Sequence, residues 1–346
     1  MSNTTYTTID LFAGIGGIRK GFEATGRFRT IYANDFDKHC KLTYDANFKN
    51  TPLTVKDIHE VGLVKDGVES FDFLLGGFPC QAFSVAGHKQ GLDDHKGRGI
   101  LFEEIERLLK EAADTQTIPP QGFMLENVKN LLNHDNKRTY PIIKQRLEAL
   151  GYHLDERVYN SLDFGVPQNR ERVYIVGFRS PEVMAAFKWP EIPGRGNLQV
   201  QDLLDSEVDP VHYYEGKPLY DRIKDYVTSD STVYQYRRNY VRENAKGVSP
   251  TLMANMGMGG HNVPIIKDAY GIRRLTPSEC GRLQGYNNLV IPAGLSYHQI
   301  YRQIGNSVTV PVINAVAEAM LQALDSVKNK KMSIPEITKR ELVSIK

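Results

Sequence analysis

Residues 7–17 read TTIDLFAGIGG, and these eleven residues give the clearest indication of the fold. The apolar run Thr7–Ala13 predicts a buried strand, and Gly14–Gly17 predicts a tight turn. Ile18–Thr25 contains helix-forming residues and ends before Gly26, so a helix is expected after the turn. Glycine allows the backbone to approach a ligand closely, and the first turn of a helix has free N–H groups. The segment therefore predicts a strand–turn–helix unit that can bind a small ligand.

An acidic residue follows the next predicted strand, Arg29–Asn34. Asp35 lies 18 residues after Gly17, where its carboxylate can accept hydrogen bonds from ribose hydroxyls. Phe12 and Phe36 are placed where an adenine ring could lie between them. The glycines lack the GxGxxG spacing of a pyrophosphate site, which favours a nucleoside without phosphates. Taken alone, these residues fit a plain glycine turn beside a solvated Asp equally well.

Strands and helices alternate along the first 180 residues. Apolar positions repeat at helical spacing in Gly99–Ala113 and Ile142–Leu150. This alternation predicts an α/β fold with a mostly parallel sheet that has helices on both faces. The predicted strands are Thr7–Ala13, Arg29–Asn34, Phe71–Leu75, Phe123–Leu125 and Val173–Phe178.

The composition changes between Trp189 and Tyr270, where Pro, Gly, Asp and Tyr become frequent and helical periodicity weakens. Helical patterns return in Leu275–Leu283 and Val310–Leu324. We therefore predict one α/β domain, residues 1–188 plus 271–328, interrupted by a smaller domain at 189–270. The polar residues 329–346 are expected to form a loosely ordered tail.

The overall composition is that of an ordinary globular protein: 346 residues, 41% hydrophobic and 24% charged. No run of 18 apolar residues predicts a membrane span, and the N-terminus lacks the pattern of a secretory signal. The three cysteines, Cys40, Cys80 and Cys280, form no CxxC pair, which favours a reduced cytoplasmic protein without a zinc site. The net charge of +2 neither requires nor excludes a nucleic acid, so any basic surface must be local.

A second motif, GGFPCQAFS at residues 76–84, follows the predicted strand Phe71–Leu75. Ligands bind beyond the carboxyl ends of strands in open α/β sheets, so Cys80 is predicted near the glycine turn. A lone cysteine is more often a small buried hydrophobe. A loop rich in Gly and Pro can instead expose a thiol and lower its pKa, which favours a reactive Cys80. The next residues, Val85–Arg98, contain three glycines and several basic side chains, and could close over a polyanion.

Two further groups of polar residues flank predicted strands. Glu126–Val128 directly follows Phe123–Leu125 and is expected to place a carboxylate at the same sheet edge as Cys80. Residues 168–172, QNRER, directly precede Val173–Phe178. Alone, the Glu could be solvated or cap a helix, and the arginines could form a surface ion-pair cluster. Near an anionic ligand, arginines of this kind can be functional.

Taken in order, six motifs resemble the DNA cytosine-5 methyltransferases of bacterial type II restriction–modification systems. They are FAGIGG, GFPCQAFS, ENV, QNRERVYIVG, RRLTPSECGRLQGY and QIGNSVTVP, and the resemblance covers about Ile9 to Met320. It implies a Rossmann-like methyltransferase domain that uses S-adenosyl-L-methionine. It also implies that the inserted residues 189–270 are a target-recognition domain.

The resemblance implies a covalent mechanism with Cys80 as the nucleophile. Carbon 5 of cytosine is a poor nucleophile until a thiolate adds at carbon 6 and turns the ring into an enamine. By the same match, Glu126 hydrogen-bonds ring N3 and the exocyclic amine and favours protonation of the ring. Arg170 and Arg172 match the arginines near the base and its phosphate.

The resemblance also implies the cofactor contacts. Asp35 matches the ribose acid and Phe36 the adenine neighbour, at positions where related enzymes often have Glu and Trp. Asp57 and Ile58 match the contact to the exocyclic amine. The other implied cofactor residues are Phe12, Gly14, Ile15, Gly17, Pro79, Leu101, Asn306, Ser307 and Val308.

A local basic strip in Tyr234–Pro250 is the candidate for DNA binding. It has four basic residues, Arg237, Arg238, Arg242 and Lys246, against the acidic Glu243, interleaved with three tyrosines. Arginines of this kind can read guanine edges or hold phosphates, although an exposed polar loop would have a similar composition. Thr251 and Leu252 resemble the pair that closes the pocket of the flipped base. We expect the loop from Gln81 to Arg98, including Ser84, to close over the DNA.

We therefore expect double-stranded DNA as the substrate, a restriction endonuclease as functional partner, and a monomer that needs no metal and no membrane. Two alternatives remain open. The same chemistry could act on transfer RNA, as in a related eukaryotic branch, although the long insert argues against it. A DNA-binding regulator without turnover is the other alternative; the intact motifs argue against it, and the first strand begins too early for an N-terminal helix-turn-helix.

Overall fold

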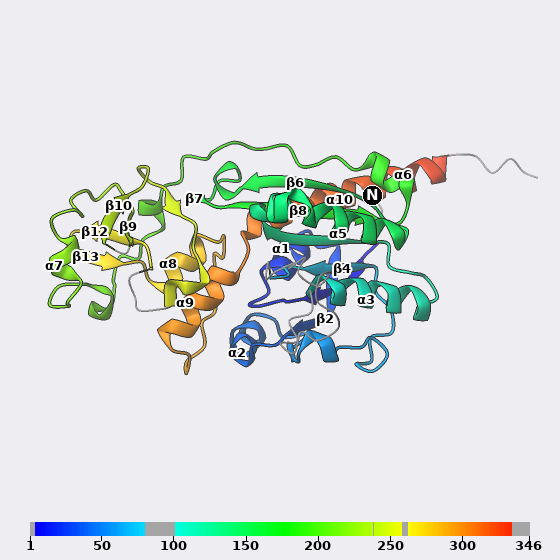
Figure 1. Ribbon diagram of the computed structural model, residues 1–346, viewed down its shortest axis with the longest axis horizontal. Coiled ribbons are helices and arrows are strands. Elements are labelled where there is room, and N and C mark those ends of the chain that lie inside the picture. Colours follow the sequence, from blue (N-terminus) through cyan, green and yellow to red (C-terminus); the bar gives the residue numbers. More distant parts are fainter. Residues whose placement is uncertain (1–3, 80–100, 238, 258–261, 334–346) are drawn as a thin grey trace, which may run out of the picture.

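The computed structural model describes residues 4–79, 101–237, 239–257 and 262–333. The chain forms a larger lobe around a seven-stranded sheet and a smaller lobe around a four-stranded sheet (Figure 1). The two lobes lie end to end, and helices α8 and α9 lie where they meet.

The larger sheet has the strand order β3-β2-β1-β4-β5-β8-β6. The first five of these strands are parallel, whereas β8 pairs antiparallel with both β5 and β6. The predicted mostly parallel α/β sheet is therefore confirmed. The strands are β1 (Tyr6–Leu11), β2 (Phe28–Asp35), β3 (Thr54–Val55), β4 (Phe73–Gly76), β5 (Gly122–Val128), β6 (His153–Asn160) and β8 (Glu171–Phe178).

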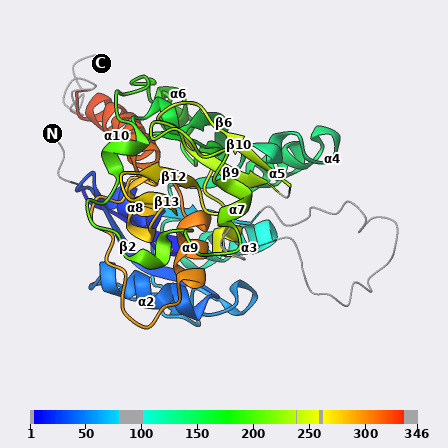
Figure 2. The ribbon, with the colours of Figure 1, turned by 90° about the vertical axis from the view of Figure 1, so that its left-hand side faces the viewer.

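Helices cover both faces of this sheet, with α3 and α10 on opposite sides (Figure 2). Side chains alternate along a strand, so Ile9 and Leu11 of β1 pack beneath one helical layer and Asp10 points to the other face. The first layer contains α3 (Leu101–Thr115) and α5 (Thr139–Ala149), and the second contains α1 (Gly17–Glu23), α6 (Pro181–Ala186) and α10 (Val310–Ser333). Helix α2 (Lys38–Asn47) packs through Cys40 and Tyr44 against residues that follow β1 or lie in β2.

Several elements differ from the sequence-based expectation. Strand β5 continues to Val128 because β8 pairs with it as far as Arg172, so Glu126 lies within a strand and not after one. Strand β6 has no counterpart among the predicted strands, since its sequence HLDERVYN is mostly polar. Helix α10 continues to Ser333, so residues 329–333 are helical and do not belong to a loose tail.

The smaller sheet has the order β10-β9-β12-β13 and is antiparallel. Its strands are β9 (Tyr234–Arg237), β10 (Tyr240–Glu243), β12 (Ile265–Asp268) and β13 (Gly271–Arg274), and the nearby helices are α7 (Tyr220–Ile223), α8 (Pro277–Arg282) and α9 (Tyr297–Asn306). The hairpin β12–β13 lies on both sides of residue 270, where the sequence predicts a domain boundary. The division into domains stays a prediction.

A short parallel pair of strands joins the two lobes. Strand β7 (Gln168–Asn169) of the larger lobe pairs with β11 (Ser249–Pro250), which precedes Thr251. The core between the lobes also contains Ile15 of the glycine turn, next to Leu252 and other apolar residues of the smaller lobe. The lobes therefore share both a hydrogen-bonded ladder and a hydrophobic contact.

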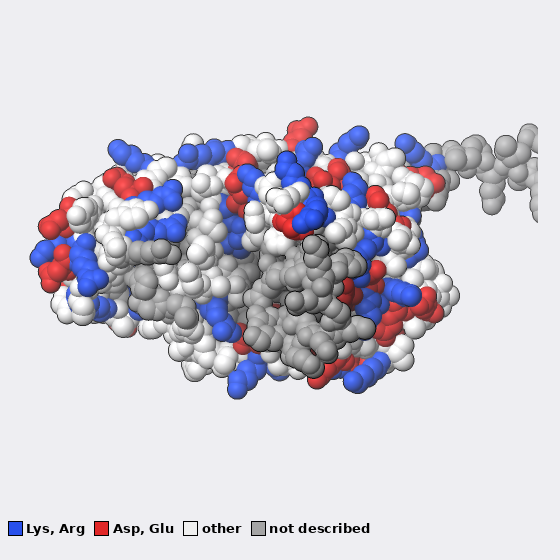
Figure 3. Space-filling model, viewed as in Figure 1, with Lys and Arg blue, Asp and Glu red and all other residues white. Residues whose placement is uncertain are grey.

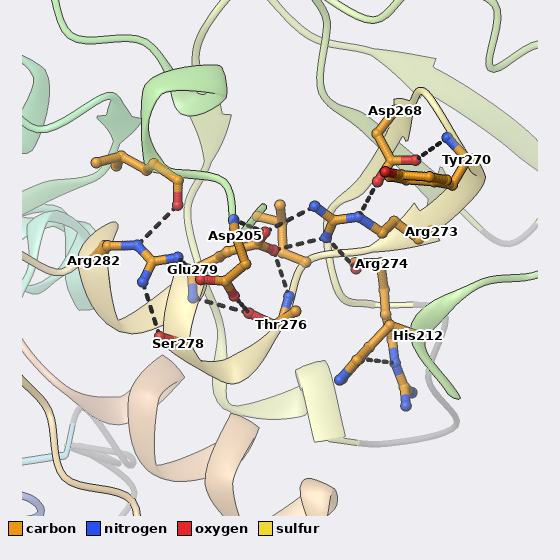
Figure 4. A network of polar contacts seen from close by, with 12 residues as sticks. Asp205, His212, Asp268, Tyr270, Arg273, Arg274, Thr276, Ser278, Glu279 and Arg282 are labelled. Atoms are coloured by element: carbon orange, nitrogen blue, oxygen red, sulfur yellow. Dashed lines mark hydrogen bonds and ion pairs between the residues drawn. The ribbon is translucent and has the colours of Figure 1, made fainter. Parts of the chain in front are cut away.

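A buried ion-pair network stabilises the smaller lobe (Figure 4). Arg273 on β13 is 1% exposed and donates to both carboxylate oxygens of Glu279 on α8, at 2.9 and 2.8 Å. Its Nε also pairs with Asp268 at 2.5 Å. Glu279 in turn accepts the N–H of Thr276 in a capping box at the start of α8. The network thus fixes α8 against the hairpin.

In the described part of the chain, α9 and α10 together are long and apolar enough to cross a membrane by length and composition. Of the apolar window in these helices, 72% is buried inside the protein, as expected for core helices.

Arg273→Ala should lower the free energy of unfolding by about 3–5 kcal/mol, because it leaves the buried Glu279 without its partner. Denaturant titration at pH 7 measures this loss. Lys224→Ala, directly after α7, is a suitable control, since Lys224 forms a surface pair with Asp221 in the same lobe. Equal stability of the two variants would contradict a stabilising role for the network.

Candidate active site and cofactor pocket

The glycine turn presents its backbone to open space at the carboxyl edge of the sheet. Phe12 and Gly14 have φ of 55° and 54°, and these left-handed residues end β1 and reverse the chain. A Cβ added to Gly14 would meet nothing within 4 Å, whereas one added to Gly16 would lie 2.2 Å from the Phe48 ring. The turn is therefore packed on one side and open on the other.

Asp35 connects the turn to the end of the neighbouring strand. Its Oδ2 accepts the N–H of Gly14 at 2.9 Å, and its Oδ1 accepts the N–H of Asp37 at 2.8 Å. Between these two acidic residues, the Phe36 side chain is 72% exposed. Burial raises the pKa of Asp35, although the backbone N–H groups oppose this shift. An aromatic face and a carboxylate thus lie side by side at the predicted nucleoside site.

Two segments distant in sequence meet at the start of α1. The Oη of Tyr286 lies 2.6 Å from the Oγ of Ser307, and a Cβ added to Gly17 would be 2.8 Å from that Oγ and from a methyl group of Val308. The structure therefore brings the predicted cofactor residues 14–17 and 306–308 together. Tyr286 was not among the predicted site residues, since its sequence position gives no sign of this contact.

The other predicted cofactor residues differ in exposure. Ile15 is buried in the core between the lobes, and Ile58 is buried beneath the sheet. Asp57 is exposed and accepts the N–H of His59 at 3.0 Å, close to the end of β2 because β3 pairs with that strand. Asn306 and Pro79 are exposed, and Leu101 is half-buried at the start of α3.

Asp10 is an orphaned carboxylate next to this turn. It is fully buried, and within the described part of the chain neither of its oxygens makes a well-formed hydrogen bond, although the backbone N–H of Arg19 is close enough to affect its pKa. Burial raises its pKa to about 8, although Arg19 of α1 lowers it in part. Asp10 was not among the predicted site residues, since it lies within the apolar run of the predicted strand Thr7–Ala13.

Glu126 is the carboxylate at the predicted catalytic position. Its Oε1 lies 3.1 Å from the Nε of Arg172, which lies diagonally across from it on β8, since Tyr174 is directly opposite Glu126 and Arg172 is opposite Val128. A Cβ added to Gly77 would lie 3.6 Å from its other oxygen, so the loop after β4 passes close to the carboxylate. Burial raises the pKa of Glu126, and Arg172 and Arg170 oppose the shift. The group therefore retains a proton to higher pH than an ordinary Glu.

The amide of Asn127 fastens the loop after β4 to β5. Its Nδ2 donates to the carbonyl of Phe78 at 2.8 Å, two residues before Cys80. Cys80 itself lies outside the described residues, as do Gln81, Ser84, Arg98 and Arg238.

The two predicted arginines occupy different environments. Arg172 is partly exposed beside Glu126. Arg170 is buried and donates to the carbonyls of Leu252 at 2.8 Å and Ser307 at 2.5 Å. Burial and the nearby Arg172 lower the pKa of Arg170 to about 9. The amide of Gln168 adds to this junction, since its oxygen accepts the N–H of Leu252 at 2.9 Å.

The basic strip of the smaller lobe divides into two faces. Tyr234 and Tyr236 pack on the core face of β9. In the antiparallel register of β9 and β10, Arg237 lies opposite Tyr240 and Arg242 lies opposite Gln235. Opposite residues share a face, and this face is the one turned away from Tyr234 and Tyr236, so both arginines lie on the outward face. Exposed Lys and Arg side chains occur on both lobes on the face shown in Figure 3. Thr251 is fixed nearby, because its hydroxyl donates to the carbonyl of Asn169 at 2.6 Å.

Asp10→Asn should flatten the dependence of stability on pH. The folded state holds a proton on Asp10 up to about pH 8, whereas the unfolded chain loses it near the ordinary pKa of 3.8. The free energy of unfolding therefore falls as pH rises between these values, by at most about 1.4 kcal/mol per pH unit from this group.

Denaturant titrations from pH 4 to 8 test this expectation. The advantage of Asp10→Asn over the wild type should grow with pH, and the exposed control Asp221→Asn should follow the wild type. Parallel curves for Asp10→Asn and wild type would show that the Asp10 carboxyl is already ionised in the folded protein.

Known proteins with similar sequences identify the family. The family model for C-5 cytosine-specific DNA methylases matches residues 6–322. The Type II methyltransferase M.Bsp6I of Bacillus sp. (strain RFL6) is 46% identical over 319 residues, covering 91% of this chain and 98% of that protein. The Type II methyltransferase M1.ScrFI of Lactococcus lactis subsp. cremoris is 39% identical over 337 residues, covering 93% and 80% of the two chains.

The fold is also found among solved structures. The Entamoeba histolytica methyltransferase EhMeth superposes with a TM-score of 0.72 at 17% identity, covering 93% of this chain and 99% of that chain. The resemblance of the motifs is thereby confirmed across the length of the protein. The chain belongs to the C-5 cytosine-specific DNA methylases and has their Rossmann-like methyltransferase fold.

Proposed function

We propose that this protein transfers a methyl group from S-adenosyl-L-methionine to carbon 5 of a flipped cytosine in a specific double-stranded DNA sequence. The observation that carries the proposal is the ion pair between the buried Glu126 and the partly exposed Arg172, beside the loop that leads to Cys80. The names of the relatives support a role in a restriction–modification system, with protection of DNA from a partner endonuclease. We expect a cytoplasmic monomer.

The chemistry of the pocket fits this cofactor. Phe36 offers an exposed aromatic face for an adenine, and Asp35 offers carboxylate oxygens for ribose hydroxyls. When bound, S-adenosylmethionine supplies an electrophilic methyl group. The residues proposed to hold it are Phe12, Gly14, Ile15, Gly17, Asp35, Phe36, Asp57, Ile58, Pro79, Leu101, Asn306, Ser307 and Val308.

Cys80 and Glu126 have complementary roles in the proposed chemistry. The thiolate of Cys80 forms a bond to carbon 6 of the cytosine, and its electrons displace the ring π bond toward carbon 5 and N3. Glu126 holds a proton at N3 and thereby stabilises the negative charge that would develop there. Its raised pKa suits this role, because the carboxyl must be protonated to donate. Carbon 5 would then bond to the methyl group as the bond from that methyl to the cofactor sulfur breaks, with S-adenosylhomocysteine as the leaving group. Transfer of the carbon 5 proton to a base would re-form the ring double bond between carbons 5 and 6 and release the thiolate of Cys80.

The two arginines, Arg172 and Arg170, have different proposed roles. Arg172 orients Glu126 and is accessible enough to contact the base or its phosphate. Arg170 acts as a positioning residue, because its guanidinium group donates to the carbonyls of Leu252 and Ser307 and so is not directed at the base. It therefore keeps Thr251 and the cofactor segment in register with the sheet.

DNA would be held between the lobes. Arg237, Arg238 and Arg242 are proposed to contact the duplex from the smaller lobe, with Thr251 beside the flipped base. Gln81, Ser84 and Arg98 are proposed to contact it from the catalytic loop. Base flipping costs a few kcal/mol, which these phosphate and base contacts would offset.

A mechanism-based duplex tests the proposal directly. With S-adenosylmethionine present, a duplex that contains 5-fluorocytosine at the target should trap a covalent adduct on Cys80, because fluorine cannot leave as a proton. Intact-mass spectrometry and peptide mapping detect it. Cys80→Ala should form no adduct and transfer no methyl group.

Methyl-transfer assays on duplex DNA and on transfer RNA separate the alternative substrates. Bisulfite sequencing of plasmid DNA from cells that express the protein identifies the methylated sequence, which is then used to design the test duplex. Methyl transfer to transfer RNA but not to duplex DNA would refute the proposed substrate, and unchanged activity of Cys80→Ala would refute the covalent route.

Glu126→Gln should lower kcat by about 10²–10⁴-fold, the usual contribution of a general acid. Cofactor binding should be retained, because Glu126 lies at the proposed base site. Single-turnover methylation and calorimetric binding of S-adenosylhomocysteine measure the two quantities. Glu103→Gln is the control, since Glu103 pairs with Arg146 on the surface of the larger lobe. An equal loss of cofactor affinity in Glu126→Gln would place Glu126 in the cofactor pocket instead.

A further inference from the structure

Three polar contacts join α9 and the loop before it to α2 and to Asp37, the residue that caps α2. The hydroxyl of Thr43 donates to Gln303 at 2.7 Å in a buried position. The side chain of Asn47 bonds both the carbonyl and the N–H of Val290, at 2.8 and 3.0 Å, just ahead of α9. The third contact is an ion pair between Arg302 and Asp37.

Asp37 has a special position, because it adjoins the proposed nucleoside site. Its Oδ1 accepts the N–H of His39 and caps α2, while Arg302 pairs with its Oδ2. Its own N–H donates to Asp35 Oδ1, the carboxylate that also accepts the N–H of Gly14. Asp37 is 11% exposed, so its orientation is constrained by its surroundings. A shift of Asp37 would move Asp35 and the exposed ring of Phe36 between them.

Helix α9 also reaches the pocket from its other end. It leads directly into Asn306 and Ser307, and the latter contacts the Tyr286 hydroxyl above Gly17. A Cβ added to Gly305 would lie 2.3 Å from the backbone of Met253, so the helix packs tightly on the segment that follows Thr251. One helix thus connects both sides of the proposed pocket to the smaller lobe.

We propose that Arg302 is a positioning residue for the cofactor, which acts through Asp37 on the orientation of Asp35 and Phe36. The inference rests on the proposed function. An ion pair with a 41% exposed arginine contributes little to global stability, so loss of Arg302 should affect the pocket more than the fold. Arg302 does not need to touch the cofactor for this effect.

Three substitutions test the proposal: Arg302→Gln, Arg302→Lys and Asp37→Asn. Arg302→Gln should raise both the KM for S-adenosylmethionine and the Kd for S-adenosylhomocysteine by on the order of tenfold. Its kcat at saturating cofactor should remain within about twofold of wild type. Arg302→Lys retains the charge and should restore most of the affinity. Asp37→Asn should resemble Arg302→Gln, and the double variant should be no worse than either single one.

Arg27→Gln is the matched control. Arg27 forms an ion pair with Asp325, with two hydrogen bonds where Arg302 has one to Asp37, and this pair joins the start of β2 to α10 at the opposite end of the sheet. It should leave KM and Kd unchanged while shifting the melting temperature about as much as Arg302→Gln. An equal rise of KM in Arg27→Gln, or affinities within twofold of wild type in Arg302→Gln, would overturn the proposal.

Binding of S-adenosylhomocysteine to the wild type separates this inference from the proposed function. If the wild type binds it and Arg302→Gln binds it equally well, only the positioning role fails. If the wild type neither binds S-adenosylhomocysteine nor methylates DNA, the proposed function is refuted. The positioning role of Arg302, which rests on that function, is then refuted as well.

Discussion

The arrangement of the site depends on one buried charge, the guanidinium of Arg170. A charged group is costly to bury unless its donors find partners, and the two terminal nitrogens of Arg170 find them in the carbonyls of Leu252 and Ser307, while its Nε has no partner among the described residues. These carbonyls come from segments that are far apart in the sequence, one in the smaller lobe and one after α9. The desolvation of a single side chain therefore requires three parts of the chain to meet at a fixed place. Gln168 and the β7–β11 ladder strengthen the same junction.

This junction explains how separate motifs become one site. Glu126 and Arg172 lie on paired strands and need only the sheet to bring them together. The pocket for the cofactor requires more, because Gly17 comes from the first turn of the fold and Ser307 from near the end of the described chain. The same contact that satisfies Arg170 fixes Ser307. The edge of the sheet that carries Glu126 and Arg172 and the proposed cofactor pocket are thus stabilised by the same interactions.

Much of the fold could be predicted from local pattern, since buried strands and amphipathic helices repeat with different periods. The position of Asp35 at the carboxyl end of β2 and the loop after β4 followed from the same reasoning. Strand β6 could not be predicted, because at a sheet edge its polar sequence HLDERVYN lacks the apolar run that marks a buried strand.

Tertiary pairing accounts for the other differences. Nothing local distinguishes Arg170 from Arg172, although one is buried and the other partly exposed. The tyrosines and arginines of β9 and β10 look interleaved in the sequence, and only the strand register shows that Tyr234 and Tyr236 lie on the core face while Tyr240 shares the outward face with Arg237 and Arg242. Arg302 and Asp37 are far apart in the sequence, and no local sequence pattern indicates that they form an ion pair.

The reversed direction of β8 has a topological consequence. In a sheet whose strands all run the same way, the groups at the reaction edge come from chain that is leaving each strand. Because β8 runs the other way, the chain that enters it supplies Arg172 there, while Phe178 ends at the far edge. If β8 ran parallel to β5, Arg179 would replace Arg172 beside the carboxylate, and the QNRER segment would lie a full strand length away. The polarity of one strand thus selects which peptide segment supplies positive charge to the reacting base.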